Sequence, residues 1–274
     1  MLGEEHPSVG AALNSLGAAH DALGDSATAL REYQSSLELR ERVLGVDHPD
    51  VAVSLNNLGY MYRDLREFER SLEHLDRAMR VLVRVYGDDH VNVGMALANL
   101  GATYYEMKRY LQAQEQLERA LAILERSLGP RHSNVATILT NLGNVHYALG
   151  APAVALGAFE RAIAIFDDTV SSGHADLAVA VQGAGDSLAQ LGRHGEAATV
   201  LERGLALRSA DDVGPFDRAT TEIALARELW ATGTDRPRAL ALARAARERL
   251  DMSNPEDAQL VAEIVAWLRG VTER

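Results

Sequence analysis

Apolar residues recur along this chain at intervals of three and four residues, and the whole pattern repeats every 42 residues. In the first copy, Val9, Leu13 and Leu16 fall on one face of an α-helix. A second apolar face begins after Gly24, which suits a helix C-cap, and Asp25, which suits the next N-cap. Each copy therefore predicts a pair of antiparallel helices, and the series predicts a stack of such pairs.

Three kinds of residue return at the same place in each copy. A histidine recurs before the first helix of the pair, at His6, His48, His90, His132 and His174. A glycine recurs inside that helix, at Gly17, Gly59, Gly101, Gly143 and Gly185. A small residue recurs in the second helix, at Ser36, Ala78, Ala120, Ala162 and Gly204. Because glycine costs a helix about 1 kcal/mol, we expect the glycines and small residues to mark close helix crossings.

The period divides residues 1–274, taken as a single repeat domain, into seven segments. A degenerate copy keeps the register at Ile223 and Ala239 but has Arg227 in place of the glycine. A last helix opening at Asn254-Pro255 is expected to cover the final apolar face, as the ends of repeat arrays require. The expected segments are units 1 to 5 at 1–45, 46–87, 88–129, 130–171 and 172–213, degenerate unit 6 at 214–252, and the capping helix at 253–274.

The repeated residues resemble the signature of the tetratricopeptide repeat, most clearly at Leu100-Gly101, Tyr104, Ala113, Leu117 and Ala120. The 42-residue period, with Leu44-Gly45 before His48-Pro49 and the run Leu55-Asn56-Asn57-Leu58, resembles the kinesin light chain subclass. This resemblance implies an all-α fold, a right-handed superhelical solenoid of antiparallel helix pairs with a C-terminal capping helix. It also implies a concave groove, lined by the first helix of each pair, that binds a partner protein.

Groove positions alternate with the buried positions of the first helices. Asn57, Asn99 and Asn141 form a neighbouring column with the same spacing, which either adds to the groove or ties adjacent helices together. Amides and tyrosines can hold an extended peptide backbone without reading its sequence. The expected partner-binding residues are Asn14, Asn56, Tyr60, Arg63, Asp64, Tyr105, Glu106, Thr140, Asn144, Tyr147, Gln182 and Asp186.

The charge of the chain narrows the choice of partner. The formal net charge is −12, which disfavours nucleic acid and anionic membranes. Arg63 is the one clear cation among several groove acids, so we expect a neutral to basic partner rather than an acidic one. The chain has no cysteine and no long apolar run, which leads us to expect a cytoplasmic protein without a membrane span.

Reaction chemistry is not indicated. One histidine per helix pair places neighbouring rings about 10 Å apart, whereas zinc needs ligand nitrogens at about 2.0–2.1 Å from a single point. We therefore expect the histidines to organise the loops, with no metal or cofactor bound. Adjacent acids such as Asp88-Asp89 suit helix caps better than catalysis. No motif places a nucleophile beside a base, so we do not expect an enzyme.

Two functions follow from these features. The first is a protein–protein interaction scaffold that binds a peptide or helix in its groove. The alternative is a rigid spacer or self-association element, because Val9, Leu13 and Leu16 lack a preceding helix to cover them. Since Leu2–Pro7 matches Leu44–Pro49, we expect the chain to be a fragment of a larger protein. Segments 226–230 and 265–268 are similar to the ends of bacterial serine/threonine kinases, which suggests a bacterial signalling protein.

Overall fold

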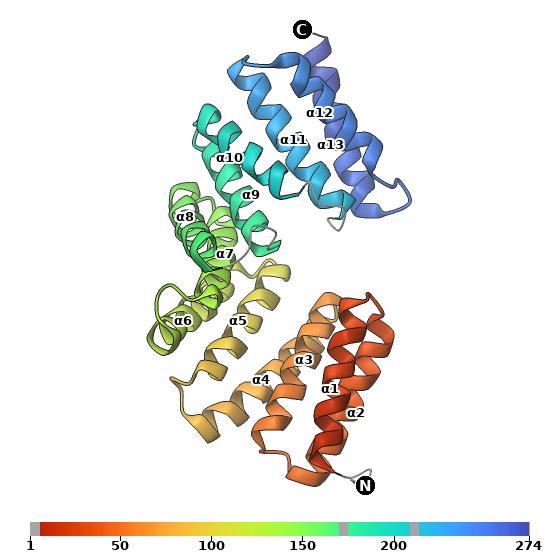
Figure 1. Ribbon diagram of the computed structural model, residues 1–274, viewed down its shortest axis with the longest axis vertical. Coiled ribbons are helices and arrows are strands. Elements are labelled where there is room, and N and C mark those ends of the chain that lie inside the picture. Colours follow the sequence, from red (N-terminus) through yellow and green to blue (C-terminus); the bar gives the residue numbers. More distant parts are fainter. Residues whose placement is uncertain (1–5, 170–174, 209–213, 274) are drawn as a thin grey trace. The chain divides into compact units, whose positions relative to one another are not determined.

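A computed structural model of the protein describes residues 6–169, 175–208 and 214–273, and these residues form thirteen α-helices and no strand. None of the helices in these ranges is both long and apolar enough to cross a membrane. The helices, labelled in Figure 1, are α1 (Pro7–Ala22), α2 (Ser26–Leu44), α3 (Pro49–Asp64), α4 (Phe68–Tyr86), α5 (Val91–Glu106), α6 (Tyr110–Leu128), α7 (Ser133–Ala148), α8 (Pro152–Thr169), α9 (Ala175–Gln190), α10 (His194–Leu207), α11 (Pro215–Thr232), α12 (Arg236–Arg249) and α13 (Pro255–Thr272).

The chain divides into two compact units, residues 1–130 and 131–274. From here on, the first unit and the second unit mean these two parts of the chain and not the 42-residue repeats. In the first unit, α1 packs on α2, α3 on α4 and α5 on α6, and the pairs join through α2–α3 and α4–α5. In the second unit, α7 packs on α8, α9 on α10 and α11 on α12, and α13 adds to the last pair. We call the first member of each pair, α1, α3, α5, α7, α9 and α11, an A helix, and its companion a B helix. The expected all-α stacking of helix pairs is confirmed.

The recurring glycines lie where an A helix meets its own B helix. A Cβ added to Gly59 would lie 2.5 Å from Leu75, and one added to Gly101 would lie 2.6 Å from Leu117. In the second unit, a Cβ on Gly185 would lie 2.6 Å from Leu201. A carbon that close to another carbon is inside van der Waals contact. The predicted close crossing is therefore observed, and it is filled by the side chain of the B helix.

The loop histidines cap the A helices. Nδ1 of His48 accepts a hydrogen bond from the backbone N–H of Asp50 at 3.1 Å. His6, His90 and His132 bond in the same way to the backbone N–H two residues later, at 3.1 to 3.2 Å. The first N–H groups of a helix have no partner inside the helix, so each imidazole satisfies one of them. His174 lies outside the described residues.

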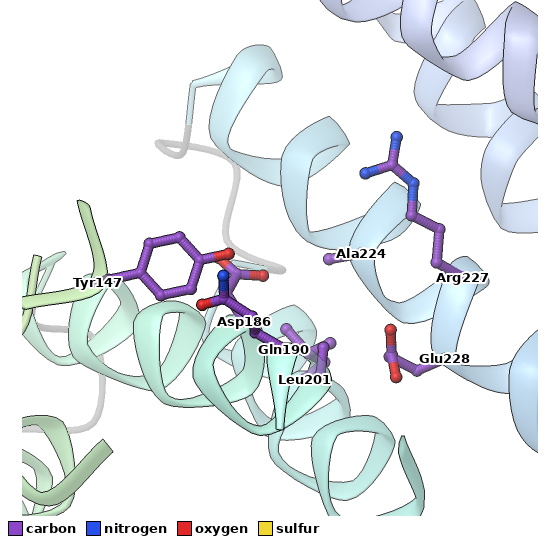
Figure 2. Close-up of a pocket in the computed structure, with 8 residues that line it drawn as sticks. Tyr147, Asp186, Gln190, Leu201, Ala224, Arg227 and Glu228 are labelled. Carbon is purple, nitrogen blue, oxygen red and sulfur yellow. The ribbon is translucent and has the colours of Figure 1, made fainter. Parts of the chain in front are cut away.

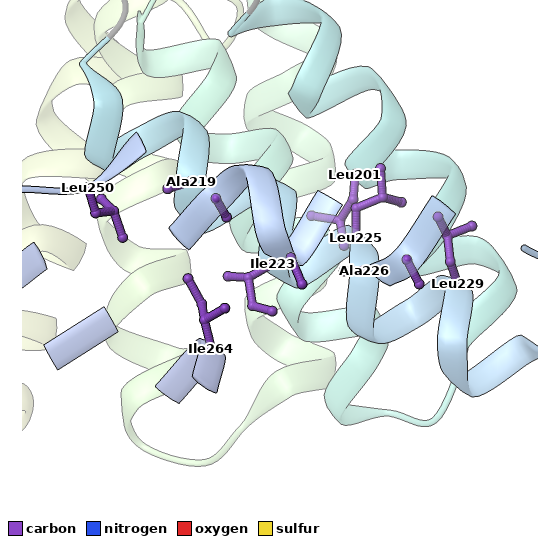
Figure 3. Close-up of a cluster of buried hydrophobic side chains, with 11 residues drawn as sticks. Leu201, Ala219, Ile223, Leu225, Ala226, Leu229, Leu250 and Ile264 are labelled. Atoms are coloured by element: carbon purple, nitrogen blue, oxygen red, sulfur yellow. The ribbon is translucent and has the colours of Figure 1, made fainter. Parts of the chain in front are cut away.

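The core of the second unit ends under α13. Leu201, Ile223 and Leu225 are buried together, and Ile264 of α13 is fully buried against them (Figure 3). The rings of Trp230 and Trp267 meet edge to face with centroids 6.0 Å apart, a favourable geometry for two aromatic rings. The last helix therefore covers the apolar face of α11 and α12, which is the role expected for a capping helix.

Candidate functional site

Asparagines hold the A helices of the first unit to one another. Nδ2 of Asn57 on α3 donates to Oδ1 of Asn14 on α1 at 2.8 Å. Nδ2 of Asn99 on α5 donates to Oδ1 of Asn56 on α3 at 3.0 Å. All four side chains are half-buried. The asparagines spaced 42 residues apart were expected either to add to the groove or to tie adjacent helices together. At Asn57 and Asn99 the structure shows the second role, with the side-chain oxygens of Asn14 and Asn56 as acceptors.

The same column of positions is buried in the second unit. Thr140 and Gln182 follow Asn14 and Asn56 at multiples of the repeat, and they are only 3% and 8% exposed. The hydroxyl of Thr140 donates to the backbone oxygen of its own helix at Ala136. These two residues therefore lie inside the unit and present little surface to a partner.

Gln182 belongs to a buried polar network. Its Oε1 accepts from the hydroxyl of Thr221 at 2.7 Å and from Nη1 of Arg208 at 3.2 Å. The guanidinium of Arg208 also donates to the hydroxyl of Thr221 and to the backbone oxygen of Asp217. Burial lowers the pKa of Arg208, against the influence of Asp217 and Asp186. The network links α9 to the end of α10 and to α11, which is a structural role.

The exposed face of α3 carries a compact cluster of Tyr60, Arg63 and Asp64. Arg63 donates from Nε and Nη2 to Oδ1 of Asp64 at 3.2 and 2.9 Å, and its guanidinium lies 4.6 Å from the centre of the Tyr60 ring. Burial, together with Asp64, raises the pKa of Tyr60 to about 12. Burial and Asp64 also raise the pKa of Asp21 on α1. Asp64 thus neutralises Arg63 within the cluster, and Asp21 on α1 adds a further acid nearby.

Tyr105 and Glu106 end the exposed face of α5. The Tyr105 ring is half-buried beside Tyr110, with centroids 5.6 Å apart, and Glu106 is exposed. Burial raises the pKa of Tyr105, with smaller contributions from Tyr110 and Glu106. The phenol is therefore a neutral group that can donate one hydrogen bond to a partner.

Helices α7, α9, α10 and α11 of the second unit line an open cavity of about 270 Å³. Tyr147 of α7 directs its hydroxyl towards Asp186 and Gln190 of α9, and Glu228 projects from α11 (Figure 2). The cavity is lined by Tyr147, Asp186, Ala189, Gln190, Leu201, Ala224, Arg227 and Glu228. Two carboxylates from neighbouring A helices therefore share one small space, and we call it the carboxylate pocket.

Burial is the main influence on Asp186. It raises the pKa of this carboxyl to about 6, even though Nε2 of Gln182 donates to Oδ1 at 3.0 Å and favours the charged form. Nearby Arg208 also favours the charge, and the carboxylate of Glu228 opposes it. Burial and Asp186 raise the pKa of the Tyr147 phenol. The pocket is short of positive charge, which a cation entering it would supply.

Glu228 has a partner on α10, outside the residues that line the pocket. Nδ1 of His194 on α10 lies 2.7 Å from Oε2 of Glu228, whose side chain is only 9% exposed. Arg227 is the one arginine or lysine among the described residues that line the pocket, and it lies 3.7 Å from Glu263 of α13. Glu228 was missed in the sequence, although it lies one 42-residue period after Asp186. Asn144 lies one period before Asp186 and is half-buried on α7.

The described ranges contain no group of three His, Asp or Glu side chains placed to hold a metal ion. The described residues that line the pocket include no serine or threonine beside the pair of His194 and Glu228. The arrangement offers charge, hydrogen-bond acceptors and an aromatic edge, which are means of binding.

Solved structures with the same fold are numerous. BtubC (BKLC) from P. vanneervenii matches with a TM-score of 0.69 and 21% identity, covering 80% of this chain and 89% of that one. A putative kinesin light chain from Podosopora anserina matches with a TM-score of 0.60 and 20% identity, covering 74% and 97%. A Rap protein complexed with Competence and Sporulation Factor matches with a TM-score of 0.67 and 17% identity, covering 95% and 74%. These identities establish a shared fold alone. A search of curated protein sequences gives no significant match.

The family comparison covers more than half of the chain. The tetratricopeptide repeat model matches at residues 8–70, 50–126 and 95–168. These segments overlap through α1 to α8, where the glycine crossings and histidine caps are most regular. With helix pairs, repeat residues and related structures in agreement, the chain belongs to the tetratricopeptide repeat family.

Proposed function

We propose that the chain is a protein–protein interaction scaffold that binds a peptide or helix of a partner along its A helices. Proteins of this family typically mediate such interactions, and the fold is generally a non-catalytic scaffold. Among the related structures, the Rap protein is in a complex with Competence and Sporulation Factor. The observation that carries the proposal for this chain is the carboxylate pocket, where Asp186 and Glu228 face the same small space.

The size of the pocket favours one side chain as its occupant. Sites for whole small molecules measure about 300–1,000 Å³, and this cavity is smaller, at about 270 Å³. A lysine or arginine side chain fits its chemistry, because the charged tip would meet Asp186 and Glu228 while the stem lies along Ala189 and Ala224. Ionised partners make the stronger hydrogen bonds, about twice those between neutral groups. We therefore propose a neutral to basic partner with a cationic anchor residue.

The remaining polar positions of the A helices give each compact unit its own proposed contact surface. In the second unit these are Asn144, Tyr147 and Asp186, and in the first unit Tyr60, Tyr105, Glu106 and the cluster of Arg63 with Asp64. In this proposal Asn14, Asn56 and Gln182 support the surface from beneath through the contacts between adjacent helices described above. Thr140 supports it through its hydrogen bond within α7. The aromatic side chains provide broad contact area at low cost in conformational entropy.

Four finer assignments belong to the same proposal. The acidic net charge of −12 supports a partner that is neither nucleic acid nor an anionic membrane. The absence of cysteine from the sequence is compatible with a cytoplasmic location. The similarity of segments 226–230 and 265–268 to bacterial kinase ends supports a role within a bacterial signalling protein. No cofactor is needed for any of these roles.

A selection from a random peptide library tests the proposal. Peptides that bind the wild-type protein should be enriched in lysine or arginine at one fixed position, and the Asp186→Asn/Glu228→Gln variant should lose that enrichment. Glu160→Gln/Glu273→Gln is a matched control, since it removes two exposed acids of the same unit that do not line the pocket. Enrichment that is the same in all three proteins, or no enrichment for any basic residue, would count against the carboxylate pocket.

Self-association is a second candidate, and two exposed leucines at the end of α1 favour it. Leu16 of α1 and Leu23, which directly follows the helix, are 49% and 82% exposed. Contiguous exposed apolar surface often mediates contact between proteins. Light scattering over a wide concentration range tests this function with the wild type and with Leu16→Ser/Leu23→Ser. A wild-type dimer that the double substitution dissociates supports self-association, and a monomer at every concentration excludes this surface.

A further inference from the structure

We propose a second binding site, in the cleft between α12 and α13, that takes an acidic and partly apolar segment of a partner protein. The cleft has a volume of about 370 Å³ and lies wholly within the second unit. Its lining differs from the carboxylate pocket in the sign of its charge. It comprises Arg244, Arg247 and Glu248 of α12 and Val265, Leu268, Arg269 and Thr272 of α13.

The three arginines of the cleft are exposed and lack an ion-pair partner within residues 6–169, 175–208 and 214–273. Two other arginines of α12 behave differently. Arg238 pairs with Glu202, and Arg249 lies 3.1 Å from an oxygen of Glu222. The one acid of the cleft, Glu248, cannot balance three guanidinium groups. The lining of the cleft therefore carries a net positive charge, although the formal net charge of the chain is −12.

The three arginines come from both helices of the cleft. Arg244 and Arg247 are three residues apart on α12, so they lie on the same face of that helix. Arg269 of α13, which follows Leu268, lines the same cleft. A guanidinium binds a carboxylate through two parallel hydrogen bonds, which gives both strength and orientation. Two or three carboxylates of one ligand can be held in this way.

The floor of the cleft decides which anion fits. Val265 and Leu268 are half-buried, and Leu268 packs against the buried cluster of the second unit. These two residues form an aliphatic strip in the lining, on the same helix as Arg269. A segment with acidic residues and a leucine or valine between them matches both parts. A nucleic acid would meet repulsion from the acidic remainder of the chain, and its backbone offers nothing to the aliphatic strip.

This site is independent of the proposed A-helix surface. It uses a B helix and the capping helix, and it selects the opposite charge. A partner of mixed charge could occupy either site alone, so substitutions in one cleft should leave binding at the other unchanged. The two proposals therefore succeed or fail separately.

Fluorescence anisotropy at physiological salt provides the test, with three labelled synthetic peptides as probes. The first alternates glutamate and leucine at helical spacing, the second replaces each glutamate with glutamine, and the third replaces each leucine with serine. We expect the wild type to bind the first peptide at least about tenfold more tightly than either of the others, a difference of one decade in Kd. Equal binding of all three peptides, or no binding of the first, would overturn the proposal.

Charge-reversal variants locate the binding. Arg244→Glu/Arg247→Glu should reduce affinity for the glutamate–leucine peptide by about tenfold or more. Arg80→Glu/Arg119→Glu changes two exposed arginines of the first unit by the same total charge and should have little effect. Arg269→Gln gives a milder change, and circular dichroism checks that each variant is folded. Equal loss in the cleft variant and the control would mean general electrostatics and would overturn the site.

Competition distinguishes a peptide site from a site for other anions. Inorganic phosphate and heparin are added to the complex of the wild type with the glutamate–leucine peptide. We expect an excess of unlabelled peptide to displace the probe and phosphate at the same concentration to leave it bound. Displacement by phosphate or heparin at lower concentrations than the peptide would show that the cleft is a general anion site, contrary to the proposal.

Discussion

A Cβ added to Gly143 on α7 would lie 2.5 Å from the ring of Phe159 on α8. The ring is fully buried, and Gly183 of α9 adjoins it in the same way. Phe159 therefore fills the space that side chains at two glycine positions would need. Interiors this closely packed respond to the addition of a single methyl group.

Gly143→Ala should lower the free energy of unfolding by about 1–3 kcal/mol, because overpacking a core costs that much. The better helix propensity of alanine offsets up to about 1 kcal/mol of the loss. Gly157→Ala in α8 is the control, since nothing lies within 4 Å of a Cβ at that position. Thermal or denaturant unfolding should show the control equal to or more stable than the wild type. Equal effects of the two substitutions would disprove the close crossing.

Replacing His48 tests the histidine caps. His48→Ala removes the acceptor for the Asp50 N–H and should lower the free energy of unfolding by about 1 kcal/mol. Asparagine is a good N-cap residue, so His48→Asn should retain most of the stability. Denaturant unfolding of the two variants measures the difference. If alanine and asparagine behave alike, the imidazole contributes nothing as a cap.

The asparagine ties can be measured with a double-mutant cycle on Asn14 and Asn57. Their side chains are joined by one hydrogen bond of 2.8 Å. Such a bond contributes about 0.5–1.5 kcal/mol to stability, so we expect a coupling energy in this range. Unfolding curves of the two single alanine variants and the double variant provide it. Additive losses would mean that the two amides do not interact in solution.

The raised pKa of Asp186 predicts how stability changes with pH. Its ordinary value of 3.8 applies to the unfolded chain and about 6 to the folded one, so the folded state binds the proton more tightly. The contribution of Asp186 to the free energy of unfolding is therefore fully present below pH 4. It falls as the pH rises towards 6 and is absent above that pH. At about 1.4 kcal/mol per pKa unit, Asp186→Asn should stabilise the protein at pH 7 by about 1–3 kcal/mol.

Unfolding measured at several pH values checks this prediction. Asp186→Asn should remove the decline between pH 4 and pH 6, while Asp167→Asn, an exposed aspartate of the same unit, should leave it in place. A decline that persists unchanged in Asp186→Asn would assign it to other groups.

The repeat architecture was predictable because identical residues return every 42 positions. Glycines, small residues and loop histidines each recur for one physical reason, and the reason is visible in the spacing alone. The caps at His48 and His90 and the crossing at Gly101 illustrate this. Local sequence determines such contacts, since they join neighbours within one helix pair or loop.

The binding face was harder to predict, because it depends on the angle between neighbouring pairs. Gln182 has the spacing of a groove residue but faces Thr221 and Arg208, which come from later helices. The sequence predicts that Arg63 is a free cation, whereas in the structure its guanidinium contacts Asp64 and the ring of Tyr60. The register of the degenerate copy would have revealed Glu228, since it follows Asp186 by one period.

The cleft between α12 and α13 could not be predicted from the 42-residue spacing. Arg244, Arg247 and Arg269 come from the part of the chain where the repeat has decayed, and their proximity depends on how α13 packs on α12. The net charge does not indicate a basic site either, since the chain as a whole is acidic. Only the packed structure shows which charges remain without an opposite neighbour.

The pH dependence of peptide binding tests the central claim most directly. A lysine-containing peptide from the library selection is titrated into the protein by calorimetry between pH 5 and pH 7. A cation in the carboxylate pocket favours ionised Asp186, whose pKa in the free protein is about 6. Affinity of the wild type should therefore rise with pH across this range, with proton release on binding, and Asp186→Asn should show weaker binding without that rise. Affinity that is independent of pH in the wild type, or unchanged by Asp186→Asn, would contradict binding at this pocket.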